Sequence, residues 1–399
     1  MAVLTRLLLR DFRNIERGDI VFPADGIVVI GDNGQGKTNL LEAIYYFQLL
    51  RSARGVRDTD LVRFDAPAFH LTAHIATDGP HTVTAAFERA GKRKKSTVDG
   101  AQPRKLSEAL GTLPAVMVSP RDVELISGAP TERRRFLDVV LALTSRRYLA
   151  ALQSYRAALV RRNSALRETA RTGRGLDAVA VWEPALAQHG AVLVAERMAW
   201  VETNAEEFTR ICARIGERAT VTMQYTTNAG TAANAYDTLL RALEHDRHRD
   251  IKRGVTHAGP HRDELPILLG GRELRTFGSG GQQRTAAIAL RMLEAATLRA
   301  HRGSPPLLLL DDPFAELDAR RAGRILALLR DAGRGQTILV VPRASDIPPT
   351  LTTLERWTID SGVIRPIGGE AAVEAAVEAA ASVGDEIAPA AHSSRELPA

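Results

Sequence analysis

The sequence predicts an α/β protein in which a long, mainly helical insertion separates two halves of one parallel sheet. The apolar run Gly26–Ile30 leads through a glycine-rich loop into a helical pattern, as a buried strand followed by a helix would. A second apolar run, at residues 307–310, ends in two aspartates. Such continuous runs are typical of strands buried on both faces of a parallel sheet. Between them, residues 119–252 are largely helical in pattern, which predicts a second lobe.

The glycine-rich loop carries the phosphate-binding pattern GxxxxGK[ST]. Its residues are Gly31, Asp32, Asn33, Gly34, Gln35, Gly36, Lys37 and Thr38. Glycines let successive backbone N–H groups converge on anionic oxygens, and the start of the following helix adds partial positive charge. Lys37 is then placed to reach the β- and γ-phosphates of ATP, and the Thr38 hydroxyl to bind Mg²⁺. The alternative is a glycine-rich turn that binds nothing, which the strand before it and the helix after it disfavour.

Two adjacent carboxylates follow the second apolar run. Because a parallel strand delivers such residues to the carboxyl edge of the sheet, we expect Asp311 to hold Mg²⁺, directly or through water. Asp312 is placed to orient or deprotonate an attacking water, and is the predicted catalytic carboxylate. The alternative is an ordinary strand with polar residues at its exit.

A serine-glycine motif precedes a further helical pattern. Residues 279–282, Ser-Gly-Gly-Gln, resemble the signature sequence of ABC-type ATPases, and residues 315–318, Ala-Glu-Leu-Asp, resemble the D-loop of that superfamily. The resemblance implies that Ser279 contacts a γ-phosphate bound to a second subunit, that Asp318 makes a contact across the dimer, and that ATP drives homodimerisation. Small residues and free N–H groups at a helix start also favour an anion on physical grounds. A flexible Gly-Ser turn is the alternative.

An ordered set of motifs closely resembles the RecF family of recombination-mediator ATPases, which are related to SMC heads. The motifs are residues 4–15, 31–39, 118–122, 130–138 and 259–263, and the resemblance covers about residues 1–345. It implies an ABC/SMC-head-type P-loop ATPase lobe with an inserted, mainly helical second lobe. It also implies binding at single-strand/double-strand junctions of gapped DNA, partnership with RecO and RecR, and help in loading RecA. The processes implied are DNA repair, replication-fork recovery and the SOS response.

The domain organisation expected from these patterns has four segments. They are residues 1–118 and 254–365 as the two halves of the ATPase lobe, residues 119–253 as the helical lobe, and residues 366–399 as a disordered tail. The tail is rich in Ala, Glu, Gly and Pro and cannot bury a core. No glutamine-loop or γ-phosphate-sensing residue is assigned, since residues 342–345 read Pro-Arg-Ala-Ser. Slow, DNA-dependent hydrolysis used as a switch fits this departure from the family pattern.

Two features of the insertion and its exit leave alternatives open. Seven apolar residues from Val194 to Ile215 repeat at alternating spacings of four and three, which fits an internal helix pair or a dimer zipper. At residues 259–263, Gly-Pro-His-Arg-Asp, the resemblance implies an element that couples lobe position to nucleotide state. The alternative there is a turn with a surface pairing of Arg262 and Asp263.

Composition and charge bear on partners and location. The 399-residue chain has a formal net charge of +6, which favours a polyanionic partner. Lys92, Arg93, Lys94 and Lys95 are expected at the tip of a hairpin and are the predicted DNA contacts; solvated surface charge is the alternative. The apolar runs are far shorter than a membrane span, so we expect a cytoplasmic protein. The single cysteine, Cys212, falls on an apolar helix face and is expected to be buried.

Two other classes of function share some of these features. An ABC-transporter-type ATPase subunit has the same loop, signature and paired acids, but its helical insertion is usually shorter and it needs a membrane partner. A DNA-binding structural protein with a vestigial nucleotide site would bind DNA equally well with and without ATP.

Overall fold

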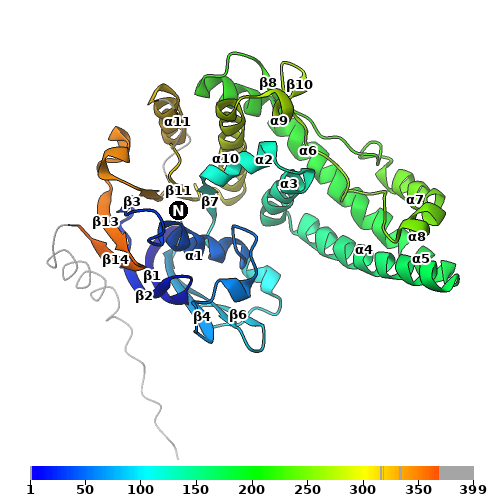
Figure 1. Ribbon diagram of the computed structural model, residues 1–399, viewed down its shortest axis with the longest axis horizontal. Coiled ribbons are helices and arrows are strands. Elements are labelled where there is room, and N and C mark those ends of the chain that lie inside the picture. The colour runs from blue at the N-terminus through cyan, green and yellow to red at the C-terminus, as the bar shows by residue number, and fades with distance from the viewer. Residues whose placement is uncertain (1, 315–316, 318, 332–334, 368–399) are drawn as a thin grey trace, which may run out of the picture.

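The computed structural model describes residues 2–314, 317, 319–331 and 335–367. Figure 1 shows a compact, sheet-containing part and an elongated, helical part that extends from it. We call the first lobe I and define it by its two large sheets with α1 (Lys37–Leu49) and α11 (Ala319–Asp331). We call the second lobe II and define it by helices α3 to α9 with the small sheet β8 to β10. Helices α2 (Glu124–Ser127) and α10 (Gly280–Arg302) lie between the lobes.

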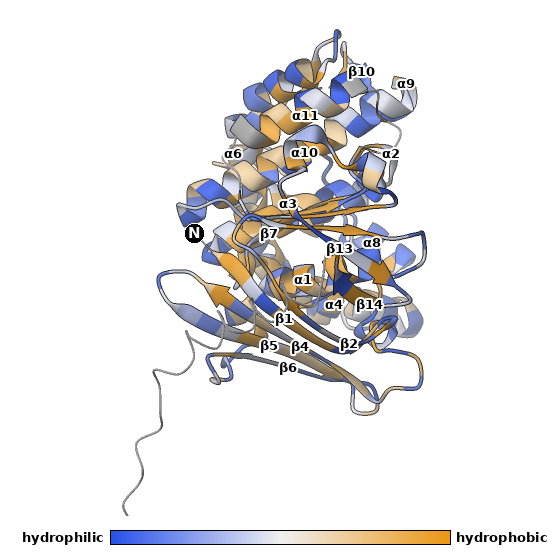
Figure 2. Cartoon of the chain, turned by 90° about the vertical axis from the view of Figure 1, so that its left-hand side faces the viewer, coloured by the Kyte–Doolittle hydropathy of each residue, from blue (hydrophilic) through white to orange (hydrophobic). Residues whose placement is uncertain are grey.

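Two sheets with α1 between them form lobe I (Figure 2). The antiparallel sheet has the order β2-β1-β4-β5-β6, with β1 (Val3–Phe12), β2 (Ile15–Val21), β4 (Ala68–Ala76), β5 (Pro80–Glu88) and β6 (Arg93–Val98). The mixed sheet has the order β14-β13-β3-β12-β11-β7, with β3 (Gly26–Ile30), β7 (Ala115–Val118), β11 (Leu307–Asp311), β12 (Thr337–Val341), β13 (Glu355–Asp360) and β14 (Val363–Pro366).

The parallel part of the mixed sheet is the predicted one. Strand β3 pairs in parallel with β12 and β13, and β11 pairs in parallel with β12 and β7. Every residue of β11 and β12 is buried, as the continuous apolar runs predicted. The parallel strands therefore present their carboxyl ends along one edge, where the loop after β3 and the acids after β11 meet. The predicted α/β fold with a helical second lobe is confirmed.

Lobe II is mainly helical, and α4 and α6 are its longest helices. Its helices are α3 (Pro130–Thr144), α4 (Arg146–Thr172), α5 (Leu176–Ala180), α6 (Glu183–Ile215), α7 (Ala235–His245), α8 (Arg247–Arg253) and α9 (Leu274–Phe277). The break between α4 and α5 falls at Gly173, which ends α4 in the left-handed conformation. Beside the helices, β8 (Val221–Met223) pairs with β9 (Ile267–Leu269), and β9 with β10 (Arg272–Glu273). Because β9 pairs with β8, a strand of the insertion, and β10 pairs with β9, we propose that lobe II extends beyond residue 253.

Helix α6 is the central helix of lobe II, and it carries the heptad-like apolar residues. It packs between α4 and α7; Val194 lies in a cluster with α7, whereas Phe208, Cys212 and Ile215 belong to the main core. This arrangement supports the internal helix pair and not an exposed dimer seam. By length and composition the segment Leu176–Ile215 could cross a membrane. In the structure, however, it buries the charged residues Glu183 and Arg197 in ion pairs.

Candidate nucleotide-binding site

The loop between β3 and α1 has the backbone that phosphate binding requires. Gly34 and Gly36 have φ of +84° and +115°, which side-chain-bearing residues rarely adopt. Within the described residues, no side chain caps the N-terminus of α1 at Gly36. The first-turn N–H groups of α1 are therefore free of side-chain acceptors and can receive an anion, aided by the helix dipole. The backbone of the predicted loop thus fits a phosphate ligand.

Lys37 and the two predicted acids line one cavity of about 420 Å³, together with Thr38. The ammonium of Lys37 donates to the carbonyl oxygens of Gly31 and Asp32. Burial lowers the pKa of Lys37, while the nearby Asp311 and Asp312 oppose that shift. Burial raises the pKa of Asp311, and a hydrogen bond with Thr38 opposes that increase. A buried carboxylate beside a hydroxyl and an ammonium is a donor set that fits Mg²⁺ and a triphosphate.

Contacts from both ends of the chain hold the phosphate loop. The amide of Asn14, in the turn between β1 and β2, donates to the Gln35 carbonyl oxygen at 3.0 Å and accepts from Asn39 at 2.8 Å. In the turn between β13 and β14, the Ser361 backbone N–H donates to the Gln35 side chain at 2.6 Å, and Gly362 N–H to the Gln35 carbonyl oxygen at 2.9 Å. The loop is therefore positioned before any ligand binds.

Four further residues that line the cavity were not predicted as site residues: Asn39, Arg54, Pro120 and Pro342. The guanidinium of Arg54 donates to Asn39 at 2.9 Å and lies 3.6 Å from the fully buried carboxylate of Glu42. Arg54 follows α1, and Pro120 follows β7, so only the tertiary fold brings them to the phosphate loop. A prediction that β7 belongs to the parallel sheet would have indicated Pro120, since β7 ends at the same sheet edge. The sequence patterns did not make that assignment.

The signature motif lies at the start of α10, as predicted. Ser279 is exposed; its hydroxyl accepts from the Gln282 backbone N–H at 3.3 Å, and the Gln282 side chain accepts from the Ser279 N–H at 2.9 Å. This capping box fixes the helix start. Ser279 does not line the Lys37 cavity of its own chain within the described residues. Its predicted role therefore requires a second subunit. Asp318, the predicted D-loop residue, lies outside the described residues.

The predicted basic hairpin is present, but one of its four residues points inward. Lys92 occupies the turn between β5 and β6, and the side chain of Arg93 is 79% exposed. Lys94 instead donates to the Leu50 carbonyl oxygen and forms an ion pair with Asp58, each at 2.6 Å. The reason is strand alternation, because Lys94 lies on the inner face of β6 with Ser96, whereas Arg93 and Lys95 face solvent. Lys94 is therefore withdrawn as a DNA contact; Lys92, Arg93 and Lys95 are retained.

The Gly-Pro-His-Arg-Asp element lies within lobe II. Asp263 is 3% exposed and accepts from the Tyr225 hydroxyl, so a surface pairing of Arg262 with Asp263 does not occur. Arg197 donates to the backbone carbonyl oxygen of Pro260 at 2.8 Å. Arg134 donates to that of Asp263 at 2.7 Å. The element is thus held by arginines from α3 and α6. Its role in coupling lobe position to nucleotide state stays a prediction.

Comparison with known proteins places this geometry in a family. Residues 3–347 match the family described as RecF/RecN/SMC N terminal domain. The DNA replication and repair protein RecF of Roseiflexus castenholzii (strain DSM 13941 / HLO8) is 36% identical over 394 residues, covering 91% of this chain and 99% of that protein. The chain belongs to the RecF family. Another RecF, from Salinibacter ruber (strain DSM 13855 / M31), is 36% identical and covers 93% of this chain.

Solved structures agree with this RecF assignment. The recombination mediator protein RecF with ATP, of the RecFOR pathway, superposes with a TM-score of 0.85 at 28% identity, covering 92% of this chain and 98% of that one. An Smc head bound to the C-winged helix domain of ScpA has a TM-score of 0.52 at 14% identity, which supports the shared head fold. Membership of the RecF family speaks against a transporter subunit.

Proposed function

We propose that this RecF-family protein is an ATP-dependent DNA-binding clamp of recombinational repair and replication-fork recovery. The observation that carries the proposal is the meeting of Lys37, Thr38, Asp311 and Asp312 around one cavity at the carboxyl edge of the parallel sheet. Ser279, at an exposed helix start, is open to a second copy of the chain. ATP held between the Lys37 cavity of one copy and Ser279 of another would join the two copies around DNA.

The residues of the site divide the chemistry among them. Lys37 and the first-turn N–H groups of α1 would hold the triphosphate, and Thr38 with Asp311 would hold Mg²⁺, which supplies Lewis-acid stabilisation of phosphoryl charge. Asp312, next to the metal-binding acid and at the same cavity, is placed to orient a water or accept its proton. Asp318 of the opposing copy would complete the interface. We propose that hydrolysis is slow, stimulated by DNA, and reopens the clamp.

The partners follow from the family. The solved relative belongs to the RecFOR pathway, and on that basis we propose that the protein acts with RecO and RecR in the cytoplasm. Gapped DNA with a single-strand/double-strand junction is the proposed substrate, and loading of RecA the proposed outcome. Lys92, Arg93 and Lys95 on the exposed face of the β5-β6 hairpin are proposed to contact DNA phosphates.

Sedimentation velocity with and without ATP tests the clamp directly. Because Lys37 holds the phosphates, we expect Lys37→Ala to bind ATP at least about a hundredfold more weakly and to stay monomeric. Asp312→Asn is expected to bind ATP normally and to accumulate as a dimer, since only the hydrolytic step is removed. Exposed Asp177, on α5, supplies the control Asp177→Asn, which is expected to behave as the wild type. A monomeric Asp312→Asn protein in saturating Mg²⁺-ATP would refute the proposed clamp.

A further inference from the structure

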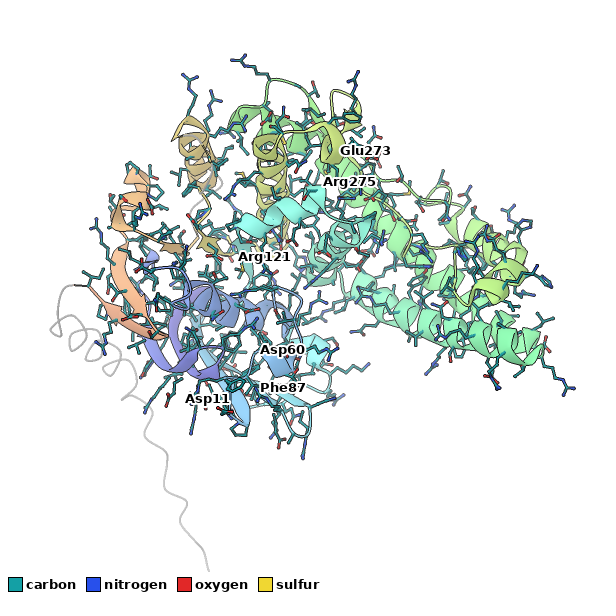
Figure 3. All side chains as sticks on the ribbon, viewed as in Figure 1. Asp11, Asp60, Phe87, Arg121, Glu273 and Arg275 are labelled. Carbon is teal, nitrogen blue, oxygen red and sulfur yellow. The ribbon has the colours of Figure 1, made fainter. Side chains whose placement is uncertain are left out.

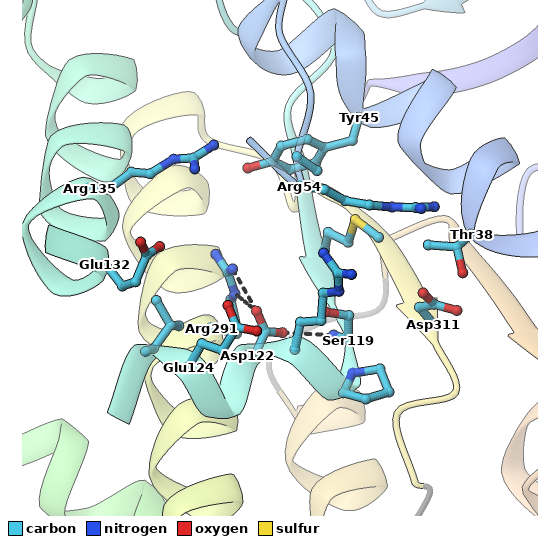
Figure 4. A pocket seen from close by; sticks show the side chains of 15 residues that line it. Thr38, Tyr45, Arg54, Ser119, Asp122, Glu124, Glu132, Arg135, Arg291 and Asp311 are labelled. Atoms are coloured by element: carbon cyan, nitrogen blue, oxygen red, sulfur yellow. Dashed lines mark hydrogen bonds and ion pairs between the residues drawn. The ribbon is translucent and has the colours of Figure 1, made fainter. Parts of the chain in front are cut away.

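Arginines from both lobes face one another beside the nucleotide cavity. Arg51 and Arg54 follow α1 in lobe I, whereas Arg135 lies on α3 and Arg156 on α4 in lobe II. A guanidinium nitrogen of Arg135 lies 3.4 Å from the Ser52 carbonyl oxygen, so the lobes touch here. A second cleft of about 420 Å³ opens at this junction, lined by Arg54, Arg121 and Arg135 (Figure 4). Figure 3 likewise places Arg121 between the lobes.

Arg51 is the unusual member of this group. It is half-buried, yet it makes no hydrogen bond or ion pair with any residue that the structure describes. Burial lowers the pKa of its guanidinium, and the like charges of Arg135 and Arg156 lower it further. Tyr45 and Asp138 act in the opposite direction. Because the positive charge is destabilised in the protein as it stands, an anion at this point would relieve both burial and repulsion.

The acids of the junction do not neutralise Arg51. Asp138 accepts from Arg156 and Arg197, each at 2.8 Å, and from the Tyr148 hydroxyl at 2.6 Å. Asp122 accepts from Arg291 at 2.7 Å. Glu124 and Glu132 also line the cleft and would repel an anion. Arg51 is not among the residues that line this cleft, so the anion belongs beside it, where Arg135 contacts Ser52, the residue after Arg51.

The β5-β6 hairpin connects to the same place. Lys94 donates to the carbonyl oxygen of Leu50, the residue that precedes Arg51. Its neighbours Arg93 and Lys95 face solvent on the other side of β6. Lys94 is paired with Asp58, so the exposed positive charge near the junction comes from Arg93 and Lys95 on β6 and from Arg156, whose side chain is 55% exposed on α4. A chain of phosphates can contact several separate basic side chains at once, which a single small anion cannot do.

We propose that a DNA backbone phosphate binds between the lobes at Arg51 and Arg135. The site rests on the proposed DNA-binding function and adds to it a contact that both lobes supply. Two guanidinium groups on opposing elements can each donate to phosphate oxygens. DNA held in this way would connect α3 of lobe II to the loop after α1, which also carries Arg54 of the nucleotide cavity.

Fluorescence anisotropy with gapped DNA and ATP, over a series of salt concentrations, tests the junction. We expect Arg51→Gln to weaken binding about fivefold to tenfold, and the Arg51→Gln/Arg135→Gln pair to reduce the slope of log K against log salt by about 1 to 2. Arg171→Gln is the matched control, because Arg171 is 73% exposed on the same long helix as Arg156 and pairs only with neighbouring Glu168 within the described residues. This control should remain within about twofold of the wild type.

The outcomes separate the two proposals. A thermal melt should show Arg51→Gln at least as stable as the wild type, because the substitution removes an unsatisfied charge. Normal affinity and salt slope in the junction variants, with weakened binding in a Lys92/Arg93/Lys95 triple-alanine variant, would overturn the junction site alone. A marked loss of stability in Arg51→Gln would make Arg51 a structural residue and also overturn it. No DNA binding by the wild type would overturn the proposed function itself.

Discussion

Arg162 in lobe II and Arg51 at the edge of lobe I are both shielded from water, but they differ in their acceptors. Arg162 is fully buried, and its two terminal nitrogens reach Asp250, Thr256, Glu183 and the Leu243 carbonyl oxygen at 2.8 to 3.2 Å. Arg51 has no acceptor among the described residues. An arginine in lobe II is thus paired with two carboxylates, whereas an arginine at the edge of lobe I has no ion-pair partner among the described residues.

This difference separates structural charge from functional charge. In lobe II, arginines join helices that are distant in sequence, and Arg247 supports Arg162 by binding the same carboxylate of Glu183 at 2.6 Å. In lobe I, apolar side chains hold the sheets together, and charged groups gather at the sheet edge around Lys37 and Asp311. Arg51 is therefore available to a ligand in a way that Arg162 is not.

The largest effect on stability is expected from breaking the Arg162 network. Arg162→Met removes a fully buried partner from both Asp250 and Glu183, which then retain only His257 and Arg247, respectively, as ion-pair partners among the described residues. The loss should lower the free energy of unfolding by about 3 to 5 kcal/mol. Urea unfolding measures this change, with exposed Arg171→Met as the control, expected within about 0.5 kcal/mol of the wild type. A loss below about 1 kcal/mol would show that the network is not structural, and would remove the contrast with Arg51.

A smaller effect is expected at the phosphate loop. Gly36→Ala places a Cβ 2.7 Å from the Asn14 amide oxygen at a φ of +115°, so the Asn14 side chain must shift and the backbone is strained. We expect a loss of about 1 to 3 kcal/mol in stability, and weaker ATP binding by calorimetry. Gly303→Ala is the control, because Gly303 has a φ of +72° with open space around it, and so carries backbone strain alone. Equal ATP affinity in Gly36→Ala and wild type would contradict the proposal that the backbone of this loop binds the phosphates of ATP.

The last effect is a pH dependence in lobe II, which is expected only in acid. His261 accepts from the Tyr155 hydroxyl and donates to the Thr256 carbonyl oxygen, and burial lowers its pKa to about 4. The neutral imidazole is favoured in the folded protein, so its contribution is complete above the unfolded pKa of about 6.5 and is lost as pH falls toward 4. Urea unfolding at several pH values should show roughly 2 to 3 kcal/mol less acid destabilisation in His261→Gln than in wild type. The same pH dependence of the unfolding free energy in His261→Gln and wild type would exclude His261 as its cause.

Local pattern predicted the parallel sheet and the phosphate site, because strand, loop and helix signals there occupy consecutive residues. Lys37, Thr38, Asp311 and Asp312 meet as expected, since parallel strands bring their exits to one edge. Arg54 and Pro120 could not be predicted, because their place depends on how α1 and β7 pack. Charge alone predicts Lys94 as a DNA contact, although strand alternation separates it from Arg93 and Lys95. Sequence also could not show that Arg51 lacks an acceptor while Arg162 has several.

The place of β3 in the mixed sheet has a consequence for synthesis of the chain. Strand β3 ends at residue 30, yet both its neighbours, β12 and β13, begin after residue 336. During translation this apolar strand therefore leaves the ribosome long before either hydrogen-bonding partner exists, with two unpaired edges. The nascent N-terminal half must avoid self-association for most of that interval, and the nucleotide pocket can form only after β11 and β12 have been synthesised.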